Sequence, residues 1–196
     1  TTHGFEAPPL VVDGTMYLIT PWPNLLYALD LTQPGAPPKW VFKPKPSAAS
    51  QGVACCGPVN RGAVFSKGRI ILNTLDGATI AVDAKSGQQV WRTAVANMQK
   101  GETITMAPLV AAGKVLVGDS GGEMGVRGSL TALDEATGKV AWKAFTTGPD
   151  KDVLIGPRFK PFYPMDRGKD LGVKAGDAVM LRFRMDRAKI YGLDFE

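Results

Sequence analysis

Histidine is almost absent from this chain, and cysteine is scarce. The 196 residues include one histidine, His3, and two cysteines, Cys55 and Cys56. A zinc site built from these residue types therefore lacks a second pair of ligands. No apolar run approaches the roughly 18 residues of a membrane-spanning helix, so we expect no membrane span. The chain starts at Thr1 without a basic and apolar leader, so no targeting segment is visible, and either a signal peptide has been removed or the front of the gene is missing.

Charge of one sign is not concentrated anywhere. Charged residues make up 21% of the chain, and its net charge is +5. The lysines and arginines are scattered, and aromatic residues are not interleaved with them as a stacking platform for bases would need. The composition therefore predicts no nucleic-acid partner, and it favours a solvated basic surface or an acidic partner.

A repeat of about 51 residues organises the chain. Its 23 glycines and 15 prolines are spread throughout, which favours short strands joined by turns. Three times, an apolar strand ends in an aspartate and leads to a tryptophan. The aspartates are Asp30, Asp83 and Asp134, and the tryptophans are Trp40, Trp91 and Trp142. In the second and third copies a glycine, Gly87 or Gly138, follows the aspartate by four positions; the first copy has prolines instead.

Each copy of the repeat is predicted to be one propeller blade. The aspartate can hold the following turn through local hydrogen bonds, and the glycine supplies a positive φ. A second hairpin is expected upstream in each copy, at residues 10–18, 62–72 and 109–117. Two hairpins make the four strands of a blade. We therefore predict an all-β partial β-propeller of three four-stranded blades, which is too few to close a ring.

The adjacent cysteines, Cys55 and Cys56, are the least common feature. Neighbouring Cα atoms lie about 3.8 Å apart, which is short of the usual disulfide range of about 4.4–6.8 Å. A bridge between them would close a strained eight-membered ring, and strained disulfides belong to the labile or functional class. Two buried thiols are the alternative.

A glycine-rich run occupies residues 118–128. Glycines let backbone N–H groups approach a ligand closely. Within the run, Ser120 adds a hydroxyl, and Glu123 adds a carboxylate suited to a hard cation. An ordinary turn is the alternative, and no strand-to-helix context supports a nucleotide fold.

The vicinal cysteines and the run from Glu123 to Gly128, on a repeat of this length, resemble the PQQ-dependent (quinoprotein) alcohol dehydrogenases, in particular methanol dehydrogenase large subunits. The resemblance covers residues 2–171 and includes the Val-Asn-Arg run at 59–61. It implies an eight-bladed propeller, of which this chain holds about three blades. The domains are predicted as a partial propeller at 1–171 and a tail of one or two strands at 172–196, which does not continue the pattern.

The same resemblance implies the residues of a cofactor site. Cys55 and Cys56 would form a disulfide that packs on the quinone of pyrroloquinoline quinone (PQQ), and Arg61 would meet one of its carboxylates. Glu123 would bind a calcium or lanthanide ion. Further contacts to PQQ are implied for Glu6, Thr105, Ser120, Gly121 and Gly122.

Each of these assignments has a plainer alternative. Glu6 could be an exposed acid near a chain end, and Thr105 an ordinary strand residue. For Arg61 and Glu123 the alternative is a surface salt bridge.

The implied parent enzyme is periplasmic, oxidises a small primary alcohol to an aldehyde through PQQ, and passes electrons to cytochrome c. The catalytic aspartate of the family has no match here, so no catalytic residue is assigned and the isolated chain is expected to be inactive. A homodimer or a small-subunit partner stays open. The alternatives are a non-catalytic β-propeller scaffold for protein–protein interaction and a truncated or fused product without function.

Overall fold

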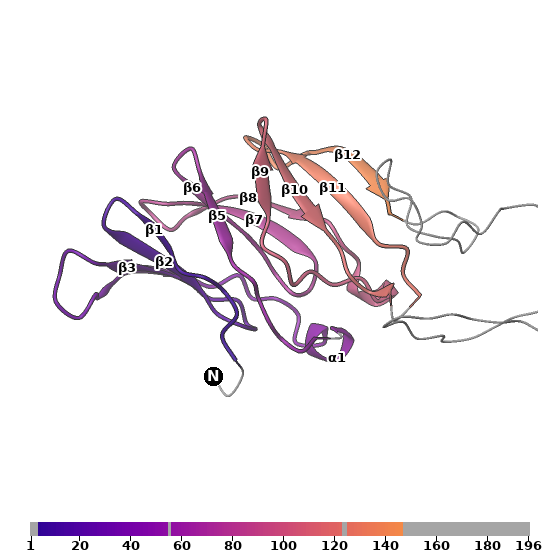
Figure 1. Cartoon of the computed structure of the whole chain (residues 1–196), viewed down its shortest axis with the longest axis horizontal. Coiled ribbons are helices and arrows are strands. Elements are labelled where there is room, and N and C mark those ends of the chain that lie inside the picture. The colour runs from indigo at the N-terminus through magenta and orange to yellow at the C-terminus, as the bar shows by residue number, and fades with distance from the viewer. Residues whose placement is uncertain (1–3, 55, 123–124, 147–196) are drawn as a thin grey trace, which may run out of the picture. The chain divides into compact units, whose positions relative to one another are not determined.

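The computed structural model describes residues 4–54, 56–122 and 125–146, which lie in one compact unit, Thr1–Phe159. These residues form three antiparallel sheets of four strands each, paired in chain order (Figure 1). The first sheet contains β1 (Leu10–Val12), β2 (Thr15–Ile19), β3 (Leu26–Asp30) and β4 (Pro38–Phe42). The second contains β5 (Ala63–Ser66), β6 (Arg69–Asn73), β7 (Ala78–Asp83) and β8 (Gln89–Ala94). The third contains β9 (Leu109–Ala111), β10 (Lys114–Gly118), β11 (Ser129–Asp134) and β12 (Val140–Phe145).

Helical structure is limited in the described residues to α1 (Ser50–Val53) and the 3₁₀ turn η1 (Met98–Lys100). Neither is long or apolar enough to cross a membrane. The predicted fold class, an all-β partial propeller of three four-stranded blades, is confirmed by this architecture. The predicted domain boundary after residue 171 and the strands of the tail lie outside the described residues, so they stay predictions.

The predicted aspartate turns are present in all three sheets. Asp83 accepts hydrogen bonds from the backbone N–H groups of Lys85 and Ser86, and Asp134 accepts one from the backbone N–H of Thr137. In the first sheet Asp30 accepts from Thr32 in the same way. The hydroxyls of Thr32 and Thr137 also donate to Asp30 and Asp134, and they lower the pKa of these two carboxylates most, followed by the backbone donors; for Asp83 the backbone N–H of Ser86 lowers the pKa most.

The second sheet is buried on both faces, because it lies between the other two. Its Ile70, Leu72 and Ile80 pack with residues of the first sheet, whereas Ile71 and Ala81 pack with residues of the third. Alternate residues of a strand point to opposite faces of a sheet, so β6 and β7 must be apolar at consecutive positions. Their sequences, Ile-Ile-Leu in β6 and Ala-Thr-Ile-Ala-Val in β7, meet that requirement.

Two tryptophans of the repeat, Trp40 and Trp91, dock on the aspartate turn of the following sheet. The indole of Trp40 packs directly on Gly87, so that a Cβ added at Gly87 would lie only 2.7 Å from Trp40 Cδ2. The Nε1–H of Trp40 donates to the carbonyl of Ala84 at 3.2 Å. Trp91 repeats this geometry on the third sheet: its Cδ2 lies 2.6 Å from a Cβ at Gly138. Glycine is therefore required at both positions by its lack of a side chain as well as by its positive φ.

The hydrogen bond is repeated as well, since Trp91 Nε1–H donates to the carbonyl of Glu135 at 3.1 Å. The third tryptophan, Trp142, is paired with Ala132 in the same register but is 44% exposed.

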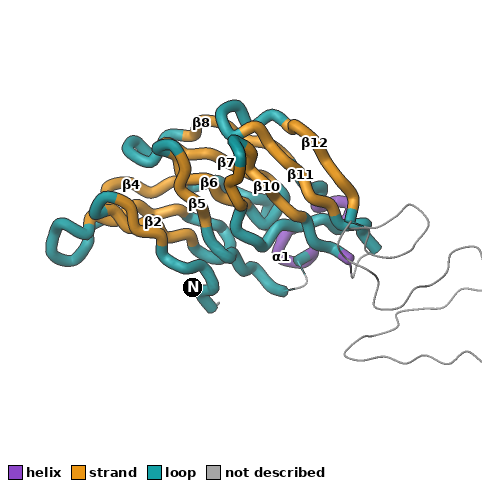
Figure 2. Tube along the Cα trace, turned by 45° about the horizontal axis from the view of Figure 1, so that its top comes forward, coloured by secondary structure: helices purple, strands orange, loops and turns teal. Residues whose placement is uncertain are grey.

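The first strands of the three sheets, β1, β5 and β9, lie in a row. β1 contacts β5, and β5 contacts β9. Figure 2 shows these strands from a second direction, with α1 lying below the sheets at the level of the N-terminal segment. This row brings together the chain segments that lead into each sheet, and the candidate site is built there.

Candidate functional site

Three of the predicted cofactor-binding residues lie on the segments that lead into the first strand of each sheet. Glu6 precedes β1, Arg61 precedes β5 and Thr105 precedes β9. Ser120 follows β10, which is antiparallel to β9, so the end of β10 lies beside the start of β9. Residues separated by more than a hundred positions in the sequence are thus expected at one end of the sheets.

Three of these residues are in direct contact. Arg61 Nε lies 3.1 Å from Glu6 Oε2, and Arg61 NH1 donates to Thr105 Oγ1 at 2.7 Å. The backbone N–H of Arg61 also donates to the carbonyl of Thr105 at 3.0 Å. The three residues come from the entries to three different sheets, and we call them the Arg61 cluster. The side chains of Arg61 and Glu6 are 43% and 44% exposed, so the cluster is accessible to a ligand.

Ser120 joins the cluster through Thr103. The backbones of Ser120 and Thr103 exchange hydrogen bonds in both directions, at 2.8 and 3.0 Å. Ser120 Oγ also donates to the carbonyl of Thr103 at 3.0 Å. The segment 103–105 therefore lies between Arg61 on one side and Ser120 on the other.

The glycines after Ser120 have different surroundings. A Cβ on Gly121 would collide with the carbonyl oxygen of Gly101, and Gly121 has φ +137°. A Cβ on Gly122 would meet nothing within 4 Å. Gly121 is thus required for close packing of the loop, whereas Gly122 leaves an open side.

Asp119 closes the base of the loop that carries these glycines. Its carboxylate is almost fully buried, and it accepts hydrogen bonds from the backbone N–H and, at 2.6 Å, from the hydroxyl of Ser129. Its own N–H donates to the carbonyl of Ser129 at 3.1 Å. The two ends of the loop, before Ser120 and after Gly128, are therefore fixed to each other.

Three predicted residues cannot be placed against this geometry. Cys55 and Glu123 lie outside the described residues, so the predicted disulfide and the predicted metal ligand stay predictions. Cys56 is exposed and precedes Arg61 by five positions. Among residues 4–54, 56–122 and 125–146, no three side chains of histidine, cysteine, aspartate or glutamate gather in a way that could hold a metal ion.

Sequence reasoning missed the buried asparagines that support the Arg61 cluster. Asn60 is 1% exposed, and its Oδ1 accepts the N–H of Gly62. Asn73 is fully buried at the end of β6 and donates to the carbonyl of Met106 at 2.9 Å. The available signal was the amide side chain itself at the end of an apolar strand, because a buried polar group needs a partner.

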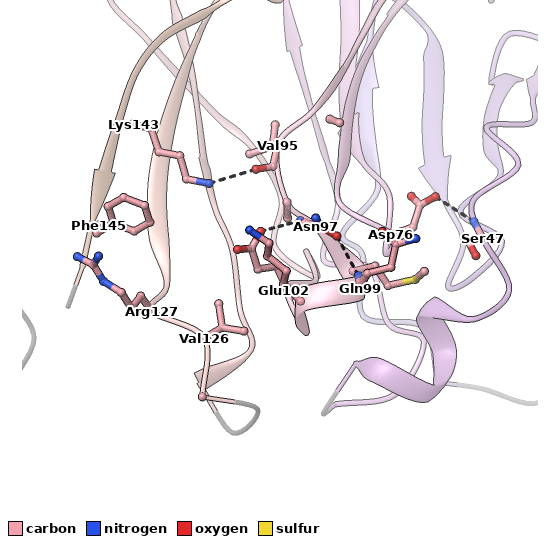
Figure 3. A pocket seen from close by; sticks show the side chains of 15 residues that line it. Ser47, Asp76, Val95, Asn97, Gln99, Glu102, Val126, Arg127, Lys143 and Phe145 are labelled. Carbon is pink, nitrogen blue, oxygen red and sulfur yellow. Dashed lines mark hydrogen bonds between the residues drawn. The ribbon is translucent and has the colours of Figure 1, made fainter. Parts of the chain in front are cut away.

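A groove of about 880 Å³ lies between the second and third sheets (Figure 3). The polar groups along it are used within the protein: Lys143 donates to the carbonyl of Val95, and Glu102 accepts the N–H of Asn97. At its other side Arg127 lies over the ring of Phe145, 4.2 Å from the centroid. Among the described residues, these contacts tie the groove's polar groups to the protein, and no residue of the Arg61 cluster lines this groove.

The donor set of the Arg61 cluster fits a ligand that carries carboxylates. A guanidinium has five N–H donors in a planar fork, and the two contacts to Glu6 and Thr105 leave others for a ligand. The hydroxyl of Thr105, which accepts from Arg61, adds a neutral donor, the hydroxyl oxygen of Ser120 adds an acceptor, and the open side at Gly122 leaves room for a planar group. The cluster is thus suited to an anionic, oxygen-rich cofactor.

Comparison with known proteins places this repeat in one family. Residues 38–195 match a family model described as "Outer membrane protein assembly factor BamB". The chain is 47% identical over 172 residues to the lanthanide-dependent methanol dehydrogenase of Methylacidiphilum fumariolicum. It is 44% identical over 185 residues to methanol dehydrogenase [cytochrome c] subunit 1 of Methylorubrum extorquens.

These alignments cover 88% and 90% of the chain, but only 28% and 29% of the respective dehydrogenases. Among solved structures, a europium-containing methanol dehydrogenase is similar with a TM-score of 0.73 and 49% identity, over 79% of this chain and 27% of that one. The chain therefore spans under a third of the length of the dehydrogenases that it matches.

Proposed function

The chain belongs to the PQQ-dependent (quinoprotein) alcohol dehydrogenase family, and from this premise we propose that the Arg61 cluster forms one side of a PQQ site. The observation that carries the proposal is the convergence of Glu6, Arg61 and Thr105 from three different sheets. An arginine that only formed a surface salt bridge would need one partner. This one is held by a carboxylate, a hydroxyl and a backbone carbonyl, and still offers N–H donors.

Arg61 is proposed to bind a carboxylate of PQQ, because a planar guanidinium can bind a carboxylate with two parallel hydrogen bonds. The hydroxyls of Thr105 and Ser120 and the backbone at Gly121 and Gly122 are proposed to orient the cofactor. Cys55 and Cys56 are proposed to form a disulfide against the quinone face. When bound, PQQ supplies a quinone that accepts hydride from an alcohol.

The metal ligand is proposed to be Glu123, because calcium and lanthanide ions prefer carboxylate oxygens. Two of the relatives named above are a lanthanide-dependent and a europium-containing methanol dehydrogenase. We extend that dependence on a hard cation to the protein that contains this chain.

The parent activity is proposed to be oxidation of a small primary alcohol to an aldehyde, with cytochrome c as the electron acceptor. The name of the Methylorubrum relative supports the acceptor. A disulfide between Cys55 and Cys56 requires an oxidising compartment, which favours the periplasm. The isolated chain is proposed to bind cofactor weakly and not to turn over alcohol, since the candidate site has no catalytic base. A homodimer or a small-subunit partner is part of the same proposal.

PQQ binding to the 196-residue chain tests the site directly. Titration calorimetry on the wild type is compared with Arg61→Gln, which keeps hydrogen-bonding capacity but removes the charge. Loss of a charge-assisted hydrogen bond costs about 1.5–3 kcal/mol, so we expect roughly 10- to 150-fold weaker binding. Arg92→Gln is the matched control, because Arg92 lies on β8 and binds the carbonyl of Pro44.

Two outcomes would contradict the proposal. If Arg61→Gln and Arg92→Gln weakened PQQ binding equally, the loss of affinity would follow from the lower net charge and not from a contact at Arg61. Absence of PQQ binding by the wild type, together with binding of a folded protein partner, would favour the scaffold function that the family model's description suggests.

A further inference from the structure

One buried asparagine links the two strand entries that carry Arg61 and Thr105. Asn73 Nδ2 donates to the carbonyl of Met106 at 2.9 Å, and Met106 directly follows Thr105. The carbonyl of Asn73 accepts Asn60 Nδ2, also at 2.9 Å, and Asn60 directly precedes Arg61. Asn73 is 0% exposed. The neighbours of both site residues are therefore attached to the same residue at the end of β6.

The amide of this asparagine is held by Thr79, which lies opposite it on β7. Thr79 is also 0% exposed, and its hydroxyl donates to Asn73 Oδ1 at 2.8 Å. A reversed amide would turn its oxygen toward the carbonyl of Met106, where two acceptors would meet without a proton between them. The carbonyl of Met106, which can only accept, therefore determines the amide orientation, and the hydroxyl of Thr79 holds the amide in place by donating to its oxygen.

The segment 103–106 is held at two points by different elements. Thr103 is paired with Ser120, after β10, and Met106 is bound by Asn73, at the end of β6. Thr105 lies between these points and meets Arg61 through both its carbonyl and its hydroxyl. Release of the bond from Asn73 would free the Met106 carbonyl and leave the segment held by the Thr103–Ser120 pair, by Arg61, and by the contacts of Ile104 with Leu75 and of Met106 with Gly118.

We propose that Asn73, held in place by Thr79, is a positioning residue that sets the spacing between the Arg61 guanidinium and the Thr105 hydroxyl. The ligand that benefits from this spacing rests on the proposed function above, namely a carboxylate of PQQ. The positioning itself is a property of the protein without ligand, so the two can be tested separately.

Hydrogen exchange of the Arg61 amide, measured by NMR on the 196-residue chain, reports the positioning without any ligand. Thr79→Val is nearly isosteric and removes only the hydroxyl that holds Asn73. Loss of one hydrogen bond predicts about two- to tenfold faster exchange of the Arg61 amide. This factor is taken relative to the change in exchange of the core amides of β7, which reports the loss of global stability.

Thr93→Val is the matched control. Thr93 lies on β8 of the same sheet, and its hydroxyl donates to the carbonyl of Gly138 at 2.6 Å, so this variant also loses one hydrogen bond donated by a threonine, here to the third sheet. It should leave corrected Arg61 exchange unchanged, whereas Thr79→Ser should restore it to the wild-type rate.

PQQ binding to the same variants then tests the ligand. Thr79→Val should weaken binding by about two- to tenfold, and Thr79→Ser should not. In a Thr105→Val background the additional effect of Thr79→Val should disappear, because the group that Asn73 positions has been removed. A residue that only stabilised the fold would give additive effects instead.

The outcomes separate the two proposals. Unchanged Arg61 exchange in Thr79→Val, or equal acceleration in Thr93→Val, overturns the positioning role. Equal PQQ affinity of wild type and Thr79→Val also overturns it, while the proposed function stands. Faster Arg61 exchange in Thr79→Val with no PQQ binding by the wild type removes the proposed function and leaves the positioning role supported.

Discussion

Replacing Gly138 with alanine isolates the contact by which Trp91 joins the second sheet to the third. Gly138 has φ +72°, and an added Cβ would lie 2.6 Å from Trp91 Cδ2 and Cε3 and 3.0 Å from Thr93 Oγ1. The indole would have to move away and would lose its hydrogen bond to the carbonyl of Glu135. The substitution thus combines a backbone penalty with disruption of packing between sheets.

Gly68→Ala separates these two costs. Gly68 has φ +75°, and a Cβ there would meet nothing within 4 Å. Its penalty is the left-handed backbone alone, about 1–2 kcal/mol. Gly138→Ala adds overpacking of about 1–3 kcal/mol and the net loss of one hydrogen bond of about 1 kcal/mol. We therefore expect Gly138→Ala to lower the free energy of unfolding by about 2–4 kcal/mol more than Gly68→Ala does.

Urea unfolding of the 196-residue chain, followed by tryptophan fluorescence, measures this difference. Gly87→Ala should behave like Gly138→Ala, because Trp40 occupies the equivalent position. Equal destabilisation by Gly68→Ala and Gly138→Ala would refute the reasoning, since it would mean that the tryptophan contact adds nothing to the backbone term.

Three further substitutions test the contact between the second and third sheets at Glu135 and the packing of the loop after Ser120. Glu135 is 3% exposed, and its pKa is lowered mainly by hydrogen bonds from Lys67 and Ser66. The ionised carboxylate therefore contributes its full stabilisation above pH 4.5. This contribution is lost as the pH falls through the lower pKa of the folded state. Glu135→Gln should therefore cost about 1–2 kcal/mol at pH 7 and progressively less below pH 4.5; urea titrations at several pH values measure this, and a constant difference would contradict it. Gly121→Ala should lower the unfolding midpoint because its Cβ meets the Gly101 carbonyl, whereas Gly122→Ala should leave it unchanged or raise it slightly. Thermal unfolding of both variants tests this, and similar losses would argue against the close packing at Gly121.

Local chemistry made most of the fold predictable. The aspartate turns after Asp30, Asp83 and Asp134 depend on hydrogen bonds that span only two or three residues. The tryptophan spacing followed from the repeat, and the structure gives its reason in the docking of Trp40 and Trp91 on Gly87 and Gly138. The repeat encodes its own neighbour contacts, so one sequence was sufficient to predict them.

The geometry of the site was harder to predict, because its contacts join distant residues. Arg61 was identified by resemblance, but its contacts with Glu6 and Thr105 span 55 and 44 positions. Asn73 reaches residues 13 and 33 positions away, and no local pattern marks those partners. The sequence predicted which residue types the site uses, whereas the supporting residues became visible only when the sheets were packed together.

The row of strand entries has a consequence for local unfolding. Glu6, Arg61 and Thr105 each belong to a different sheet, and Asn73 and Met106 attach the second sheet to the third. A sheet can therefore keep all its own hydrogen bonds while a small slip against its neighbour separates the donors. The geometry of the site accordingly depends on the docking between sheets as well as on the hydrogen bonds within them. Ligand affinity would therefore decrease when one sheet moves against its neighbour, even if neither sheet unfolds.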